Sequence, residues 1–202
     1  MARLNPPDKS AVLELEPFIG LGLADIRQPQ TAAQYEQAWA ELNAHRHIGF
    51  DTESRPTFTK GHESQGPDVV QFATPAHAYV FQLRDTASEA LVRAVLTSQD
   101  LVKVGFDLQQ DQTQLRRRLG VEASPVLDLT KVFHSRGYPR TLGIKSAVAV
   151  VFGQRFVKSK RVTTSNWSNE RLEPRQVIYA ANDAFVALRV MQALGLDDSA
   201  RG

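Results

Sequence analysis

The stretch IGFDTES, residues 48–54, places two carboxylates directly after three residues that are typical of the end of a buried strand. We predict that the first core strand is HRHIGFD, residues 45–51. Side chains two residues apart in a strand share a face, so Asp51 and Glu53 project together at its carboxyl end, where α/β folds usually place their sites. Two carboxylates about 4 Å apart repel each other by about 4 kcal/mol at an effective dielectric of 20. A nearby cation is therefore expected, although Asp-x-Glu also occurs on ordinary surface strands.

The composition is that of one globular domain. The chain has 202 residues, of which 42% are hydrophobic, and its formal net charge is +2. It has no cysteine, which excludes disulfides and thiolate zinc sites. No apolar run reaches the roughly 18 residues of a membrane helix, and the first ten residues lack an apolar signal core. These features predict a soluble, intracellular protein, which we place in the cytoplasm.

The pattern around the two carboxylates alternates strands and helices. VVQFAT and AYVFQL, joined by a short turn at Pro75, predict an antiparallel hairpin. A further strand is expected in LVKVGF, and PVLDLTKVF predicts a short strand followed by the start of a helix. An amphipathic helix is expected at residues 31–44, and helices at residues 88–98, 109–120, 141–153 and 173–195. The class is therefore α/β, with a mixed β-sheet flanked by helices in a single domain. We expect an N-terminal arm at 1–30, the domain at 31–195 and a tail at 196–202.

The last of these helices carries a second candidate site. Tyr179 and Asp183 are four residues apart, so they share a helix face. Asp183 stands in an apolar stretch, where a carboxylate needs a metal or another partner. The alternative is an exposed aspartate paired with Arg175 or Arg189.

Two aspartates compete in VGFDLQQD, residues 104–111. Asp107 ends the predicted strand and is placed to cap the following helix, which is a structural role. Asp111 lies one turn into that helix and is placed to turn back over the strand ends.

Positive charge is concentrated between residues 136 and 175, where nine basic residues face only two acidic ones. Such a stretch indicates a polyanion-binding face or an ordinary solvated surface. Lys158, Lys160 and Arg161 precede the last helix and are its best candidates for phosphate contacts. The long polar loop at 54–68 contains Phe58, which is a candidate for stacking on a base or for simple packing.

Taken together, FDTE, VGFDLQQD and YAAND resemble the three motifs of the DEDD superfamily of 3′–5′ exonucleases. The spacing Tyr-x₃-Asp in YAAND is that of the tyrosine-bearing branch. KSKRVTTSNWS, which precedes the third motif, resembles the Werner-type exonuclease and ribonuclease D domains. The resemblance covers residues 31–195 and implies a ribonuclease H-like fold with two bound Mg²⁺ or Mn²⁺ ions.

The resemblance also implies roles for individual residues. The catalytic set is Asp51, Glu53, Asp111, Tyr179 and Asp183. Its four carboxylates would hold the metals, with Asp51 bridging both, and Tyr179 would aim the attacking water. Asp107 is then structural. The candidate nucleic-acid contacts are Thr52, Lys158, Lys160, Arg161 and Trp167, with loop packing as the alternative role for Trp167.

The expected activity is metal-dependent removal of nucleoside 5′-monophosphates from single-stranded or frayed 3′ ends, with DNA slightly favoured over RNA. One alternative is a non-catalytic nucleic-acid-binding or scaffolding domain on the same fold, which would be expected to lack at least one carboxylate. Another is a phosphoesterase for small nucleotides, which would not need the basic stretch.

Overall fold

The computed structural model describes residues 3–56 and 66–197. Within them the strands are β1 (Ile26–Arg27), β2 (His47–Glu53), β3 (Val69–Ala73), β4 (Ala78–Gln82), β5 (Val102–Gly105) and β6 (Val126–Asp128). The helices are α1 (Lys9–Leu13), α2 (Ala32–Asn43), α3 (Thr86–Thr97), α4 (Gln109–Leu119), α5 (Leu129–Ser135), α6 (Ile144–Phe152), α7 (Lys160–Thr163) and α8 (Pro174–Ala193), with a 3₁₀ turn η1 at Leu23–Asp25. None of these helices combines the length and the apolar character needed to cross a membrane.

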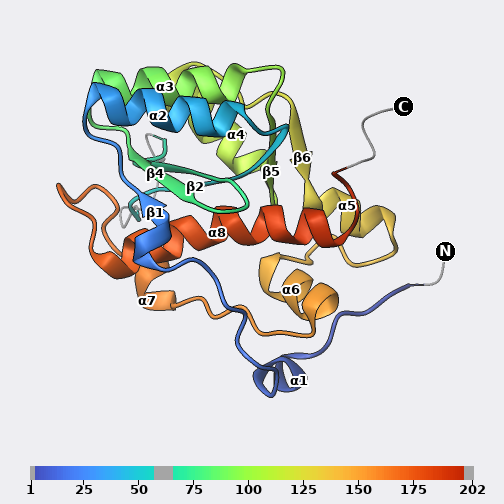
Figure 1. Ribbon diagram of the computed structural model, residues 1–202. Helices are drawn as coiled ribbons and strands as arrows, with labels where there is room; N and C mark the ends of the chain where they lie inside the picture. Colours follow the sequence, from blue (N-terminus) through green and yellow to red (C-terminus); the bar gives the residue numbers. More distant parts are fainter. Residues whose placement is uncertain (1–2, 57–65, 198–202) are drawn as a thin grey trace.

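The strands form one mixed sheet in the order β1-β4-β3-β2-β5-β6. Strand β3 runs antiparallel to both of its neighbours, β2 and β4, and its pairing with β4 is the predicted hairpin. Strand β5 runs parallel to both β2 and β6, and β1 runs parallel to β4. Helices α2, α3 and α4 cover one face of the sheet and α8 crosses the other (Figure 1). The predicted α/β class and the mixed sheet flanked by helices are confirmed.

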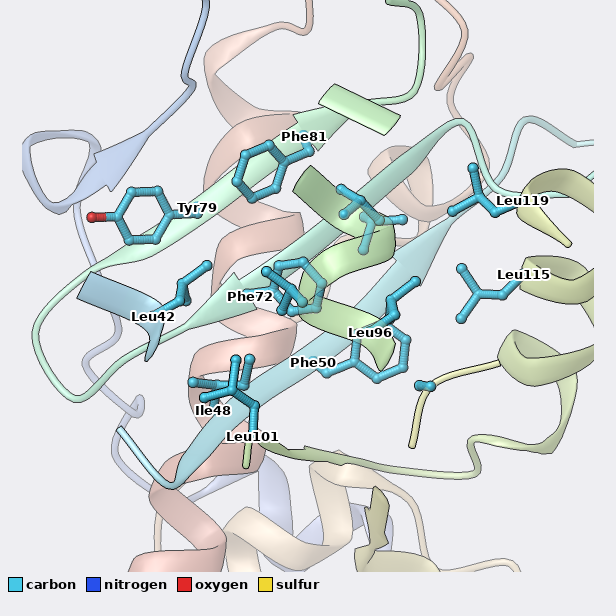
Figure 2. Packing of buried hydrophobic residues seen from close by; sticks show 14 of the residues in the cluster. Leu42, Ile48, Phe50, Phe72, Tyr79, Phe81, Leu96, Leu101, Leu115 and Leu119 are labelled. Atoms are coloured by element: carbon cyan, nitrogen blue, oxygen red, sulfur yellow. The ribbon is translucent and has the colours of Figure 1, made fainter. Parts of the chain in front are cut away.

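The face under α2, α3 and α4 holds an aromatic core. Phe50, Phe72 and Phe81 come from three neighbouring strands and lie side by side beneath the leucines of the covering helices (Figure 2). The ring centroids of Phe50 and Phe72 are 5.8 Å apart, and those of Phe72 and Phe81 are 6.0 Å apart. Because strand side chains alternate, filling this face with Phe50 directs Asp51 to the opposite face.

The opposite face is shaped by its close approach to α8. A Cβ atom on Gly49 would lie 2.0 Å from the carbonyl oxygen of Ala184, so only glycine allows this contact. Ala180, Ala181 and Ala184 are fully buried against the sheet. Because these side chains are small, the backbone of α8 lies close to β2. Asp183 is therefore placed near the carboxylates of that strand.

Two details of the sequence prediction are wrong. Strand β2 does not end at Asp51 as predicted, because antiparallel pairing with β3 continues as far as Glu53 opposite Val69. Asp107 does not cap α4: the N-cap is Leu108, without a side-chain hydrogen bond. Asp107 instead has a left-handed backbone with φ of 52°, and its N–H donates to side-chain oxygens of the β6–α5 junction. Its role is still structural, but through its backbone.

The N-terminal segment packs onto the fold. It contains the short helix α1, and it contributes β1 to the edge of the sheet. Asn182 of α8 accepts a hydrogen bond from the Leu21 N–H at 2.8 Å and donates one to the Leu21 carbonyl at 3.1 Å. A Cβ on Gly20 would meet the Asn182 amide at 1.9 Å, so glycine is needed for this close contact. The segment is thereby fixed beside Asp183.

Candidate active site

Three of the predicted catalytic carboxylates form one cluster. Asp51 and Glu53 project from β2 and Asp183 from α8, and each offers an oxygen within 4.8 Å of the others. The strand alternation and the close approach of α8 at Gly49 together produce this arrangement. The opening carboxylate pair therefore shares a face, as its spacing predicts, and meets the third-motif aspartate across the sheet–helix boundary.

The fourth carboxylate, Asp111, lies beside this cluster without being part of the three-residue group. It projects from the first turn of α4, and its Oδ1 accepts a hydrogen bond from the Thr52 hydroxyl. Thr52 lies between Asp51 and Glu53 in β2 and faces the other way. Thr52 therefore links the aspartate of α4 to the strand that carries the first motif.

One cation lies among the carboxylates. The ammonium of Lys158 is 2.5 Å from Asp183 Oδ2 and 4.9 Å from the centre of the Tyr179 ring. Burial alone lowers the pKa of Lys158, but Asp183 and Asp51 more than offset it and raise that pKa, so the ammonium stays charged. The charge of Lys145 also lowers the pKa of Asp183, but these lysines are fewer than the four acidic groups.

The acidic groups resist ionisation. Burial raises the pKa of Asp51 to about 7, with a further contribution from Asp183. Burial, followed by the charges of Asp51 and Asp183, raises the pKa of Glu53 to about 10. Burial and then Asp51 raise the pKa of Asp111 to about 7. Burial raises the pKa of Asp183 to about 6, although Lys158 lowers it. The four carboxyl groups therefore need more positive charge than the nearby side chains supply in order to be ionised together at neutral pH.

The cluster has the properties expected of a divalent metal site. Mg²⁺ and Mn²⁺ prefer hard oxygen ligands, which these carboxylates supply. Asp183 Oδ1 is buried and has no hydrogen-bond partner among residues 3–56 and 66–197. A buried carboxylate oxygen without a donor is costly unless a cation satisfies it. The donor set and this oxygen both fit a divalent cation.

Tyr179 lies next to the cluster and is held from two sides. Its hydroxyl is 2.8 Å from the Thr163 hydroxyl, and its ring is 6.0 Å from the ring of Trp167. Burial, with a further contribution from Asp183, raises the pKa of Tyr179 to about 12. The phenol is therefore protonated at neutral pH and can act as a hydrogen-bond donor.

The predicted nucleic-acid contacts divide into separate groups. Trp167 is fully buried and its indole N–H donates to the Thr163 carbonyl, which favours the packing alternative over a nucleic-acid contact. Lys160 and Arg161 are exposed on α7 near the cluster. Lys158 is directed into the cluster, and Phe58 lies outside the described residues.

The basic stretch does not form one continuous surface. Arg136 donates to the Leu194 carbonyl, and Arg155 to the carbonyl of Leu13, so both serve the packing of chain ends. Arg175 pairs with Glu173 at the start of α8. Residues 158–161 lie next to the site, Arg175 also lines the space beside Tyr179 and Asp183, and the charge of Lys145 lowers the pKa of Asp183.

Sequence reasoning missed two residues of the site. Thr163 holds the Tyr179 hydroxyl, but nothing in its spacing indicated this. Gln71 is fully buried on β3 opposite Asp51. A polar residue in the middle of the apolar strand VVQFA was the available signal for Gln71.

A cavity of about 350 Å³ opens beside the cluster. Lys158, Tyr179 and Asp183 line one side of it, and Phe18 and Ile178 line another. The space between the N-terminal segment and α8 therefore reaches the candidate metal ligands.

The sequence matches the model of the 3′–5′ exonuclease family over residues 26–197. The mouse bifunctional 3′–5′ exonuclease/ATP-dependent helicase WRN is 29% identical over 157 residues, which are 76% of this chain and 11% of that protein. The Drosophila melanogaster exonuclease 3′–5′ domain-containing protein 2 is 35% identical over 107 residues, covering 52% of this chain and 18% of that protein. This chain thus spans a small part of the length of these relatives.

Solved structures share the fold. The Nibbler EXO domain of Aedes aegypti has a TM-score of 0.74 at 20% identity, covering 89% of this chain and 91% of that one. Trypanosoma brucei RNase D has a TM-score of 0.75 at 22% identity, covering 87% of this chain and 66% of that one. These likenesses support the ribonuclease H-like architecture expected from the motifs. The family match over most of the chain shows more: this protein belongs to the 3′–5′ exonuclease family.

Proposed function

We propose that the protein removes nucleoside 5′-monophosphates one at a time from the 3′ end of single-stranded or frayed nucleic acid, using two divalent cations. The proposal rests on one observation: carboxylate oxygens of Asp51, Glu53 and Asp183 lie within 4.8 Å of one another, in a chain that belongs to this family. Asp111 and Tyr179, which the family resemblance also assigns, lie next to these three.

The two cations would be held by the carboxylates of Asp51, Glu53, Asp111 and Asp183, with Asp51 shared between them. Mg²⁺ and Mn²⁺ both suit this donor set. When bound, such a pair supplies a nucleophilic hydroxide near neutral pH and stabilises the attacking and leaving oxygens of an in-line displacement. The Thr52 hydroxyl keeps Asp111 turned toward β2, which brings the fourth carboxylate to the others.

Tyr179 would orient the attacking water. Its raised pKa keeps the phenol protonated, and its contact with Thr163 at 2.8 Å fixes the position of the hydroxyl. Lys158 lies beside the Tyr179 ring, and its ammonium could contact a phosphate oxygen if the ion pair with Asp183 is broken. Both residues would then contact the reacting phosphodiester.

The substrate would approach over the cavity beside the cluster and over α7. Lys160 and Arg161 are exposed there and can neutralise backbone phosphates. Trypanosoma brucei RNase D, whose fold has a TM-score of 0.73 to this chain, has been solved in complex with RNA U12, which supports a polynucleotide substrate. The slight preference for DNA over RNA stays a prediction.

The test uses DNA and RNA oligonucleotides of one sequence, labelled at the 5′ or the 3′ end. We expect a ladder shortening by single nucleotides from the 5′-labelled strand and immediate release of a labelled mononucleotide from the 3′-labelled strand, with Mg²⁺ or Mn²⁺ and not with EDTA. Asp51→Asn is the inactive control. Internal cleavage products, or full activity in Asp51→Asn, would overturn the proposal, whereas binding without cleavage would favour a scaffolding domain.

A further inference from the structure

Gln71 is a buried polar side chain without a hydrogen-bond partner among the residues that the structure describes. It lies in the middle of β3 with no exposed surface. Neither its Nε2 nor its Oε1 makes a hydrogen bond within the described ranges 3–56 and 66–197. Buried amides are normally hydrogen-bonded, because an unmet donor or acceptor loses its hydration without compensation. Within the part of the chain that the structure describes, the side chain therefore lacks the partner that a buried amide needs.

The strand register indicates where that partner lies. Gln71 is directly opposite Asp51 in the antiparallel pair of β3 with β2. Directly opposite residues share a face, with Cβ atoms about 4.5–5.5 Å apart. On its other side Gln71 pairs with Val80 of β4, which offers no polar atom.

The helix above this face presents three alanines without polar side-chain atoms, while its polar residues Tyr179 and Asp183 belong to the candidate active site. Ala180, Ala181 and Ala184 of α8 pack on it in the same apolar cluster as Val80. Asp51 is therefore the adjacent acceptor, and an amide can donate to it without adding a charge. The uncharged donor differs in this respect from Lys158, whose ammonium competes with a metal for carboxylate oxygens.

We propose that Gln71 is a positioning residue of the metal centre, whose Nε2–H donates to the Asp51 carboxylate and sets its orientation when the cations are bound. This inference rests on the proposed metal site. A carboxylate shared by two cations must present its oxygens in fixed directions, and hydrogen bonds from neighbouring residues commonly set those directions. Asp51 enters from a rigid central strand, so a donor on the adjacent strand is well placed to do this.

A comparison of Gln71 with a second glutamine of the sheet, Gln82, distinguishes a positioning role from a packing role. Gln82 of β4 lies on the same face, and its Nε2 donates to the Asn169 carbonyl at 2.8 Å. That glutamine has a structural partner away from the carboxylates. Gln71 has none within residues 3–56 and 66–197, so an apolar residue of similar size would suit its surroundings better if packing were its only role.

The experiment measures Mn²⁺ binding by calorimetry and thermal unfolding in EDTA for Gln71→Leu. We expect Mn²⁺ to bind roughly 10–100-fold more weakly than to the wild type, as for loss of other ligand-orienting groups. The unfolding temperature in EDTA should be unchanged or higher, because two unmet polar atoms are removed. Gln82→Leu is the matched control and should bind Mn²⁺ normally while unfolding at a lower temperature.

Unchanged Mn²⁺ affinity in folded Gln71→Leu would overturn the proposal and leave Gln71 as a packing residue. Gln71→Met keeps the length of the side chain and gives the same comparison where the leucine variant does not fold. Asp51→Asn separates the two hypotheses. If the wild type binds Mn²⁺ and Asp51→Asn does not, the metal site stands, and an unaffected Gln71 variant refutes only the positioning role.

Discussion

The ammonium of Lys158 lies where it would compete with a metal ion for Asp183. The sequence predicted a surface lysine that contacts substrate phosphate, and the structure places its ammonium 2.5 Å from Asp183 Oδ2. A divalent cation on that oxygen and the ammonium cannot occupy the same place. We therefore expect cations that also use Oδ2 to displace Lys158 from Asp183, and the displaced ammonium would then be available to a phosphate oxygen.

Removing this lysine should have opposite effects on metal affinity and on stability. In Lys158→Met we expect Mn²⁺ to bind about tenfold more tightly, within the roughly 1–3 kcal/mol typical of coupling between sites. The variant should unfold at a lower temperature in EDTA, because the carboxylates lose their counter-ion. Lys160→Met, which removes an exposed positive charge two residues away, is the control. Equal Mn²⁺ affinity in both variants would refute competition at Asp183.

Tyr179 allows a similar test of its hydroxyl. Tyr179→Phe should bind Mn²⁺ and substrate normally but lower kcat at least tenfold, since loss of a positioned proton-handling group costs about 10²–10⁴-fold. KM should change little. Thr163→Val removes the partner of the phenol at 2.8 Å and should show a smaller loss of kcat. A wild-type rate for Tyr179→Phe in single-turnover assays would make Tyr179 a packing residue.

Strand β2 and helix α8 form the framework of the site, and both were predictable. The apolar run before Asp51 indicated the strand, and the four-residue spacing of Tyr179 and Asp183 indicated one helix face. The segment before α8 was not predictable in the same way. Lys158 reaches the cluster through an irregular stretch with no hydrophobic period, so its position depends on tertiary packing. The same holds for the missed contact of Thr163.

The contact between β2 and α8 predicts a strong effect of Gly49→Ala. The added Cβ would lie 2.0 Å from the Ala184 carbonyl oxygen, so the helix must shift away from the sheet. We expect a loss of roughly 1–3 kcal/mol in the free energy of unfolding, together with weaker Mn²⁺ binding. Gly143→Ala, whose Cβ meets nothing within 4 Å, is the control for urea unfolding. Equal stability of the two variants would contradict the close approach.

The net charge of the whole protein does not indicate where the site lies. A net charge of +2 gave no indication of an acidic cluster, because basic residues elsewhere balance it. The basic stretch at 136–175 did not predict one binding surface, since the fold distributes Arg136, Arg155 and Arg175 to separate contacts. Sequence motifs located the carboxylates, whereas the fold determines which charges reach them.

The cluster predicts a pH dependence of the metal-free protein. The pKa values of Asp51 and Asp111 are raised to about 7 from ordinary values near 4, so the folded state binds more protons than the unfolded state between these limits. Stability from these groups is therefore lost as the pH rises through that window. We expect urea unfolding in EDTA to show a larger loss from pH 5 to pH 8 in the wild type than in Asp51→Asn. Equal losses would contradict the raised pKa of Asp51.

The central claim is that Asp51, Glu53, Asp111 and Asp183 hold the catalytic cations. Anomalous diffraction from crystals grown with Mn²⁺ and a nucleoside 5′-monophosphate tests it directly. The account predicts two manganese peaks bounded by these four carboxylates, with Asp51 in contact with both and Lys158 moved off Asp183. Manganese peaks only elsewhere on the protein, or an ion pair of Lys158 with Asp183 that persists at saturating Mn²⁺, would contradict it.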